Sequence, residues 1–361
     1  MAIFAQTIRM EKIKIGITSG DINGIGLEVI LKALKNPSIL ELFTPVLYGN
    51  IKISSYHKNI VQLDNLSFHV LHQGEKPKAG KLNLVNCWND TVTINLGKAS
   101  PDGGKYALLS LEKAVEDVVK GDIDAIVTAP VNKASMRLAG SMHLGHTSYL
   151  KEKAGETDVL MMMVSHKLKV GLVTDHIPLS QVPSTLSKEL ILRKILIMEE
   201  SLRKDFGIPK PQIAVLGLNP HAGEEGLLGN EEESFIRPAV IEAKKNGLFV
   251  SGPYPSDGFF GSGMFSKFDG ILAMFHDQGL IPFKTLTFNS GVNYTAGLPF
   301  VRTSPDHGTA FEIAGKNMAD PGSMIQAMYW AKDLILEKRG YVEMRQNVLK
   351  KRPKLSEEMS E

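Results

Sequence analysis

The feature that most constrains the fold of this chain is the alternation of short apolar runs with longer amphipathic stretches. The strand candidates are Ile13–Thr18, Pro45–Tyr48, Ala125–Ala129, Val159–Val164, Val170–Thr174, Ile213–Leu218 and Gly270–Phe275. The helix candidates are Leu27–Leu34, Tyr106–Val119, Lys188–Arg203, Glu231–Lys245 and Gly322–Glu337. Because Val- and Ile-rich runs alternating with helices are typical of sheets covered on both faces, the pattern predicts an α/β protein with a largely parallel sheet. The stretch 51–101 mixes turns with short strands, and we expect it at the periphery.

Composition narrows the class of protein. A chain of 361 residues is long enough for a sizeable core and suggests about two lobes. Charged residues are 22% of the chain and the formal net charge is +2, so nothing indicates a nucleic-acid partner or an acidic membrane surface. With one cysteine, Cys87, no intrachain disulfide can form, which fits a reducing cytoplasm. No apolar run has the length of a bilayer span, so we expect no membrane partner.

Three histidines follow strand candidates and could bind a metal. His176 comes after VGLVTD, His221 after IAVLGLNP and His276 after GILAMF. A lone histidine at a strand end is more often structural, but three in the same position resemble the ligands of an open metal site. Their spacing is not that of a helix-borne zinc site, so the fold would have to assemble the site. Asp277, next to His276, is either a carboxylate that orients the ring or a turn cap.

An early glycine-rich turn, SGDINGIGLE, invites comparison with a dinucleotide-binding fingerprint. Its glycines, Gly20, Gly24 and Gly26, do not have the G-x-G-x-x-G spacing, and the next strand candidate ends without the expected acidic residue. A tight strand-to-helix turn, with Asp21 or Asn23 capping the helix, is the better interpretation.

A later glycine-rich segment, DHGTAFEIAGKNMADPGS, spans residues 306–323. It is similar to the adenosine-binding loop of the isocitrate and isopropylmalate dehydrogenases, with an Asp at position 320 where those enzymes usually have Asn. The similarity implies NAD(P) bound outside a Rossmann fold, with His307, Gly308 and Asp320 at the cofactor.

Basic and amide residues follow the third histidine. Lys284, Asn293 and Arg302 lie in apolar, glycine-containing surroundings and could bind a phosphate or carboxylate, because lysine offers a point charge and arginine a planar fork. In GHTSYL, His146 and Thr147 follow a glycine and suit similar contacts, although from the residues alone a structural role is the better interpretation.

Taken together, these segments closely resemble the 4-hydroxythreonine-4-phosphate dehydrogenase family. The matching strings are KIGITSGDINGIG, TAPVNK, GHTSYL, TDHIPL, LGLNPHAGEEG, FHDQGL, GVNYTAGLPFVRTSPDHGTAFEIAGK and ADPGS, with a weak match over 51–101. The resemblance implies the two-lobed, three-layer α/β/α architecture of the isocitrate/isopropylmalate dehydrogenase type, with a cleft between lobes. We expect residues 1–130 plus 294–361 to form the cofactor-side lobe and 131–293 to form the metal- and dimer-forming lobe.

The resemblance also implies roles for individual residues. His176, His221 and His276 would bind one divalent metal ion (zinc, magnesium or cobalt), and the substrate contacts would be His146, Thr147, Lys284, Asn293 and Arg302. The active site would lie at a homodimer interface, with metal ligands from both subunits.

The implied reaction is oxidation of 4-phosphohydroxy-L-threonine by NAD or NADP, followed by decarboxylation to 3-amino-2-oxopropyl phosphate, in pyridoxal phosphate biosynthesis. Two alternatives stay open. A related dehydrogenase could oxidise a phosphorylated sugar acid, such as 4-phospho-D-threonate or 4-phospho-D-erythronate. A phosphotransacetylase-type acyltransferase shares the broad architecture but has no use for a metal, so the three histidines count against it.

Overall fold

One twelve-stranded sheet forms the centre of the molecule. The computed structural model describes residues 12–143, 145–155, 158–287 and 290–346. Within them the strand order is β3-β4-β2-β1-β5-β12-β11-β6-β7-β10-β8-β9. The strands are β1 (Lys14–Thr18), β2 (Thr44–Gly49), β3 (Phe68–Leu71), β4 (Leu82–Asn86), β5 (Ala125–Thr128), β6 (Leu160–Val164), β7 (Lys169–Leu172), β8 (Gln212–Leu216), β9 (Phe249–Tyr254), β10 (Gly270–Ala273), β11 (Val292–Ala296) and β12 (Val301–Pro305). The sheet is mostly parallel, but β11 is antiparallel to β12 and β6, and β6 is antiparallel to β7.

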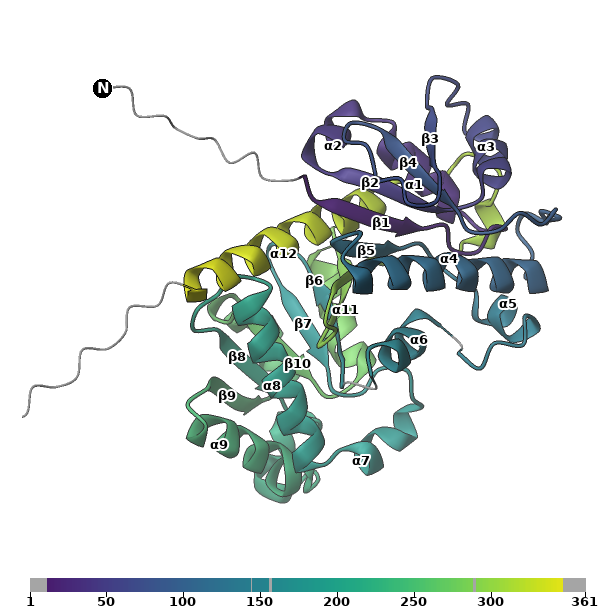
Figure 1. Cartoon of the computed structure of the whole chain (residues 1–361). Coiled ribbons are helices and arrows are strands. Elements are labelled where there is room, and N and C mark those ends of the chain that lie inside the picture. Colours follow the sequence, from purple (N-terminus) through teal and green to yellow (C-terminus); the bar gives the residue numbers. More distant parts are fainter. Residues whose placement is uncertain (1–11, 144, 156–157, 288–289, 347–361) are drawn as a thin grey trace, which may run out of the picture.

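Helices cover both faces of this sheet (Figure 1). They are α1 (Gly26–Leu34), α2 (Pro37–Leu42), α3 (Ile51–Ile60), α4 (Pro101–Lys120), α5 (Lys133–Leu138), α6 (His146–Lys153), α7 (Val182–Thr185), α8 (Lys188–Lys204), α9 (Arg237–Lys245), α10 (Ser256–Gly261), α11 (His276–Leu286) and α12 (Gly322–Gln346), with the short turns η1 (Leu179–Gln181), η2 (Pro220–Gly226), η3 (Glu232–Ile236), η4 (Met264–Lys267) and η5 (Phe311–Ile313). The helices and the sheet form three main apolar clusters. The first includes residues of α1, α8, α9 and α12, the second residues of α4 and α6, and the third residues of α10 and α11. Neighbouring strand residues alternate between clusters: Leu272 of β10 belongs to the first, and Ile271 and Ala273 belong to another. This arrangement confirms the predicted three-layer α/β/α architecture.

Helix α4 shows how local sequence signals set the ends of an element. Ser100 caps its first turn by accepting from the Gly103 amide, Pro101 occupies the first helical position, and Gly121 ends it at φ 80°. The helix starts five residues before the predicted Tyr106, because Gly103 and Gly104 weaken the apolar pattern there although both are buried.

Several helices and strands lie where the sequence pattern did not predict them. The stretch 51–101 is not only a peripheral excursion, because α3, β3 and β4 lie within it and β4 extends the sheet beside β2. Strands β9, β11 and β12 were also missed, as was α11, whose Gly279 and Pro282 are untypical of a helix interior. The predicted helix Glu231–Lys245 begins with the π-helical turn η3 and continues as α9.

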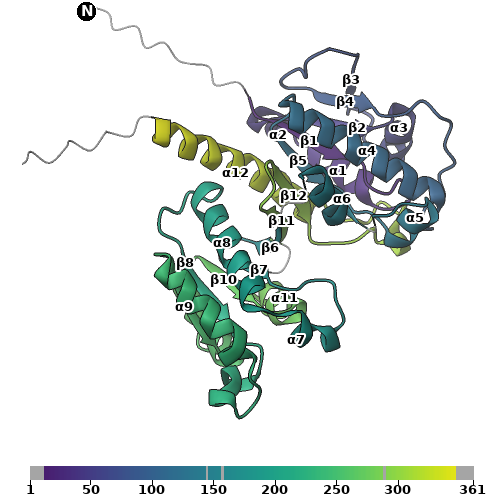
Figure 2. The same cartoon turned by 60° about the horizontal axis from the view of Figure 1, so that its bottom comes forward.

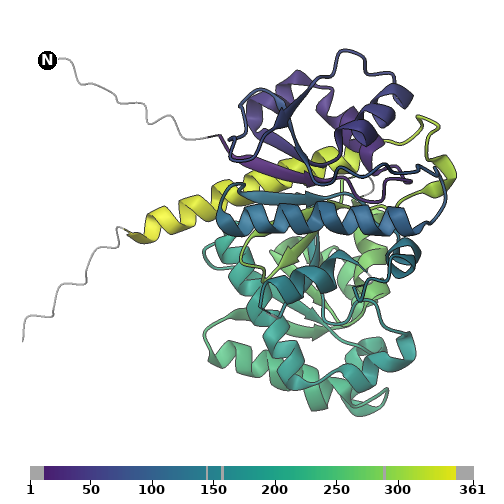
Figure 3. The same cartoon turned by 45° about the vertical axis from the view of Figure 1, so that its right-hand side comes forward.

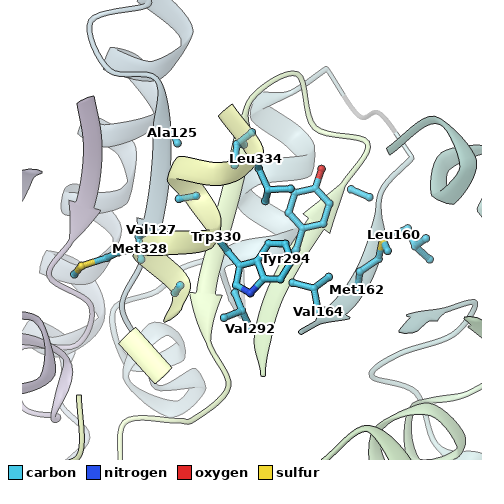
Figure 4. Packing of buried hydrophobic residues seen from close by; sticks show 14 of the residues in the cluster. Ala125, Val127, Leu160, Met162, Val164, Val292, Tyr294, Met328, Trp330 and Leu334 are labelled. Atoms are coloured by element: carbon cyan, nitrogen blue, oxygen red, sulfur yellow. The ribbon is translucent and has the colours of Figure 1, made fainter. Parts of the chain in front are cut away.

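The middle of the sheet joins its two halves. The half with β1 to β5 and the half with β7 to β10 flank strands β12, β11 and β6 (Figure 2). There Tyr294 of β11 and Trp330 of α12 are buried among Val164, Val292 and Leu334 (Figure 4). The two-lobe division stays a prediction, and its boundary between 293 and 294 falls inside β11. Among the described residues, no helix is both long and apolar enough to cross a membrane.

Candidate active site

The three predicted metal ligands follow three neighbouring parallel strands. Strand β10 pairs with β7 on one side and β8 on the other, so the carboxyl ends of all three lie at the same edge of the sheet. His176 and His276 lie side by side there, with ring centroids 5.8 Å apart. Both rings are accessible, with 58% and 36% of their side chains exposed. They line a cavity of about 270 Å³.

Carboxylates stand beside both rings. Oδ1 of Asp277 lies 2.7 Å from Nδ1 of His276, as expected of a carboxylate that orients the ring. Asp175 accepts from the backbone amide of His176 at 2.6 Å and lies 3.7 Å from its Nδ1. Bonding to His176 lowers the pKa of Asp175 to about 2. Because the carboxylates occupy the Nδ1 sides, each Nε2 remains for a ligand, and this donor set fits a divalent metal ion.

His221 does not join this pair. The described residues contain no group of three or more histidine, cysteine or acidic side chains placed to hold a metal. His221 is exposed in η2, where it and Ala222 have φ values of 53° and 52°, in the left-handed region. Glu232, 1% exposed, supports this loop by accepting from the amides of Leu218 and Asn219 at 2.7 and 2.8 Å. That role could not be predicted from the sequence, because one glutamate in a helical pattern resembles a surface residue.

Arg302 is a buried cation without an acidic partner in the described part of the chain. It is 3% exposed. It donates to Thr128 Oγ1 at 2.6 and 3.1 Å, to Thr295 Oγ1 at 3.1 Å and to Asn293 Oδ1 at 3.3 Å. Burial lowers the pKa of Arg302 to about 10, so the guanidinium remains charged at neutral pH. A buried charge held only by neutral groups is costly, and a bound anion would offset that cost.

His146 adds a hydrogen-bonding group beside this cation. Its Nδ1 lies 3.4 Å from the Arg302 guanidinium. Burial, assisted by the Arg302 charge, lowers the pKa of His146 to about 3, so the ring is neutral. Because a guanidinium can only donate, Nδ1 accepts and Nε2 carries the proton. Nε2 is buried and has no hydrogen-bond partner among the described residues, which suits an incoming oxygen atom. Thr147, half-buried, follows on α6.

A second cavity, of about 230 Å³, brings predicted substrate and cofactor residues together. Its lining includes Lys284, Asp306, His307 and Asp320. Lys284 pairs with Asp306 at 3.1 Å. Burial raises the pKa of Asp306, and the bond to Lys284 partly opposes that shift. Nε2 of His307 is buried, and the part of the chain that the structure describes offers it no hydrogen-bond partner, which fits a polar ligand such as a nucleotide. Gly308, next to it, is exposed.

The early glycine-rich turn lies against the later glycine-rich segment. The Ile25 amide donates to the Thr309 carbonyl at 3.1 Å. The expected helix cap is wrong, because α1 starts after Ile25 with no side-chain cap, and Asp21 accepts from the Asn23 amide instead. The buried contact between turn and loop could not be read from either segment alone.

Comparison with known proteins identifies the family of this chain. The family model described as pyridoxal phosphate biosynthetic protein PdxA matches residues 41–331. A 4-hydroxythreonine-4-phosphate dehydrogenase from Bacteroides thetaiotaomicron is 48% identical over 341 residues, 94% of this chain and 93% of the relative. A relative from Oceanobacillus iheyensis, provisionally named D-threonate 4-phosphate dehydrogenase, is 41% identical and covers 89% of this chain and 97% of its own length.

Solved structures of the same family have a similar fold. The crystal structure of 4-hydroxythreonine-4-phosphate dehydrogenase from Klebsiella pneumoniae is 36% identical, has a TM-score of 0.78 and covers 90% of this chain and 98% of its own. The chain therefore belongs to the PdxA family of pyridoxal phosphate biosynthetic proteins, a family of dehydrogenases.

Proposed function

We propose that this enzyme oxidises 4-phosphohydroxy-L-threonine with NAD(P)+ and then decarboxylates the product to 3-amino-2-oxopropyl phosphate. The observation that carries the proposal is Arg302, buried without an acidic partner among the described residues. Its guanidinium lies 3.4 Å from Nδ1 of His146, and Nε2 of the same ring has no partner in that part of the chain. In the first step the C3 hydroxyl loses its proton and C3 gives its hydride to the nicotinamide. The resulting β-keto acid then loses its carboxylate as CO2, and C2 takes up a proton.

The proposed substrate contacts form two groups. Arg302, Asn293 and His146, followed by Thr147, would hold one anionic end of the substrate in a pocket of low polarity, where charge-assisted bonds are strong. Lys284 would reach the substrate from the second cavity, exchanging its bond with Asp306 for one with a substrate oxygen.

We propose that His176 and His276 of one protomer and His221 of a second copy bind a divalent metal ion in a homodimer. The accessible pair of rings and the exposed, separate His221 support this arrangement. A groove of about 800 Å³ beside α11, lined by Phe260, Ile281 and other mostly apolar side chains, offers a surface for the second copy. An imidazole set favours zinc over magnesium. The metal would supply positive charge beside the reacting oxygen.

We further propose that NAD or NADP binds at residues 306–323, the cofactor loop. His307 has an unpartnered, buried Nε2, and Gly308 leaves its backbone exposed for close approach. Asp320 lines the same cavity, and its Oδ1 accepts from the Gly322 amide at 2.7 Å. The balanced composition and lone cysteine support a cytoplasmic location for the enzyme.

The alternative substrate is a phosphorylated sugar acid, favoured by the relative provisionally named for D-threonate 4-phosphate. The two substrates differ at C2, which carries an amino group in one and a hydroxyl group in the other. A dehydrogenase assay with both substrates and both cofactors, with and without a chelator, tests the proposal. We expect reduction of the cofactor with 4-phosphohydroxy-L-threonine and its loss after chelation. Turnover only with the sugar acid would overturn the substrate assignment.

A further inference from the structure

We propose that Glu28 and Lys32 of α1 are positioning residues for the cofactor loop, and that the glycine-rich turn before α1 supports the same loop. The inference rests on the proposed placement of NAD(P) at residues 306–323. It gives a function to the early motif, which resembles a nucleotide fingerprint but lacks its spacing.

The far end of the loop is held by an ion pair on α1. Glu28 is 2% exposed, and its Oε1 accepts from the Ala319 amide and from Lys32 Nζ, both at 2.8 Å. Lys32 Nζ also donates to the carbonyls of Ala319 at 2.9 Å and Asn317 at 3.1 Å. Glu28 therefore binds the amide of Ala319, and Lys32 binds the carbonyl of the same residue.

The near end of the loop is held by the turn itself. The Ile25 amide donates to the Thr309 carbonyl at 3.1 Å. A Cβ on Gly24 would lie 3.0 Å from Thr309 Cβ and from its carbonyl oxygen, so only glycine allows this approach without displacement. The yellow-green loop lies against the purple N-terminal segment in Figures 1 and 3.

The middle of the loop is supported through a third segment. Asn23 is fully buried, and its Oδ1 accepts from the Asn95 amide at 2.7 Å while its carbonyl accepts from the Gly97 amide at 2.9 Å. Gly97, at φ 75°, lies so close to the Phe311 carbonyl that a Cβ would approach it within 2.7 Å. Asn23 thus links the turn to the backbone that touches the loop.

The loop backbone has a left-handed conformation at two points. Ala310 and Asn317 have φ values of 40° and 58°, a region that alanine disfavours and asparagine adopts more readily. Ala310 follows Thr309, whose carbonyl binds the Ile25 amide, and the carbonyl of Asn317 itself binds Lys32. If these contacts were lost, the loop would relax, and the apparent cofactor affinity would fall in proportion to the fraction still in the binding conformation.

The test compares Glu28→Gln and Lys32→Met with the matched control Lys35→Met, an exposed lysine at the end of the same helix. Binding of NADH and NADPH is measured by fluorescence titration without substrate, and hydrogen exchange is measured at the Ala319 amide and at β5 amides. We expect the cofactor Kd to rise about tenfold or more in both variants, as for loss of a charge-assisted hydrogen bond. Exchange should accelerate at Ala319 but not in β5, and the KM for the phosphorylated substrate should stay unchanged. The control should match the wild type.

Gly308→Val separates failure of this inference from failure of the proposed cofactor site. If Gly308→Val raises the cofactor Kd but neither α1 variant does, the positioning role is wrong. If none of the three changes the Kd, NAD(P) binds elsewhere and both assignments are wrong. A purely structural role would lower thermal stability and accelerate exchange in β5 as well, without a selective change in cofactor Kd. Lys32→Met keeps the test usable should Glu28→Gln fail to fold, because Lys32 is only partly buried.

Discussion

At the scale of single residues, the environment of Arg302 says most about what the site binds. Its guanidinium is buried among threonine hydroxyls, an amide and a neutral imidazole. Natural proteins pair buried charges, because an unpaired one costs several kcal/mol. The partner in this site is therefore expected from outside the chain, and a substrate carboxylate or phosphate meets that need.

Arg302→Lys should raise the KM for the phosphorylated substrate about ten- to a hundredfold, because the loss of a charge-assisted contact costs about 1.5–3 kcal/mol. An ammonium keeps the charge but cannot reproduce the planar fork that reaches Thr128 and Asn293 together. Steady-state kinetics with both substrates measure the effect, and the cofactor KM should not change. Arg193→Lys, at an exposed ion pair with Asp158, is the control. An unchanged substrate KM in Arg302→Lys would contradict the assignment.

His57 makes a prediction about pH. It is 2% exposed, its Nε2 contacts the Ile22 carbonyl at 2.9 Å, and burial lowers its pKa from 6.5 to about 4. The unfolded chain therefore binds more protons between these values, so stability falls as the pH falls below 6.5. Between about pH 7.5 and about pH 5, the free energy of unfolding should therefore fall by about 2 kcal/mol less in His57→Gln than in the wild type. Urea unfolding at both pH values measures it, and an unaltered pH dependence in the variant would exclude His57 as a cause.

At the scale of elements, two irregular segments carry the proposed ligands. The loop with His221 is supported by Glu232 of the π-helical turn η3, and the cofactor loop is supported by α1. In both cases a buried acid accepts hydrogen bonds from backbone amides of a segment that contains residues with left-handed φ. In the proposed site, function would therefore depend on irregular backbone that regular elements hold in place.

Gly308→Val tests the cofactor loop with little risk to the fold. A Cβ at Gly308 meets nothing within 4 Å, and the residue has no left-handed φ. The fold should therefore tolerate the substitution, while a bulky side chain blocks an approaching cofactor. The KM for NAD(P) should rise about tenfold or more, with a small change in Tm. Gly340→Val in α12, also without neighbours within 4 Å, is the control. A cofactor KM equal to that of the control would refute the placement.

At the scale of the whole molecule, the arrangement of histidines predicts complementation between protomers. His176→Ala and His221→Ala should each be inactive alone, because each removes one ligand from both sites of a homodimer. After unfolding and refolding as an equal mixture, about half of the dimers would be mixed, with one complete site each, which restores about a quarter of wild-type activity. His176→Ala mixed with His276→Ala should restore none, because both ligands come from one protomer in the proposed site. Recovery in that control mixture, or none in the first, would contradict a shared site.

What the sequence determined by itself is local. Runs such as the one ending before His276 form buried strands, because β-branched and other apolar side chains suit a covered sheet, and the histidines after them lie at strand ends. Elements that depend on distant partners could not be predicted: β11 and β12 pair in the centre of the sheet, and α11 forms despite Pro282.

Only the tertiary structure decided how the candidate residues meet. Strand order brings His176 and His276 together, and the left-handed loop keeps His221 apart. The fold buries the charged Arg302 among neutral partners. Packing of α1 against the cofactor loop joins two motifs that are far apart in the sequence: Ala319 and Glu28, which share a hydrogen bond, are separated by 291 residues. These contacts join residues that are distant in the sequence. They could not be predicted, because the spacing of residues along the chain does not show which distant side chains lie close together in the fold.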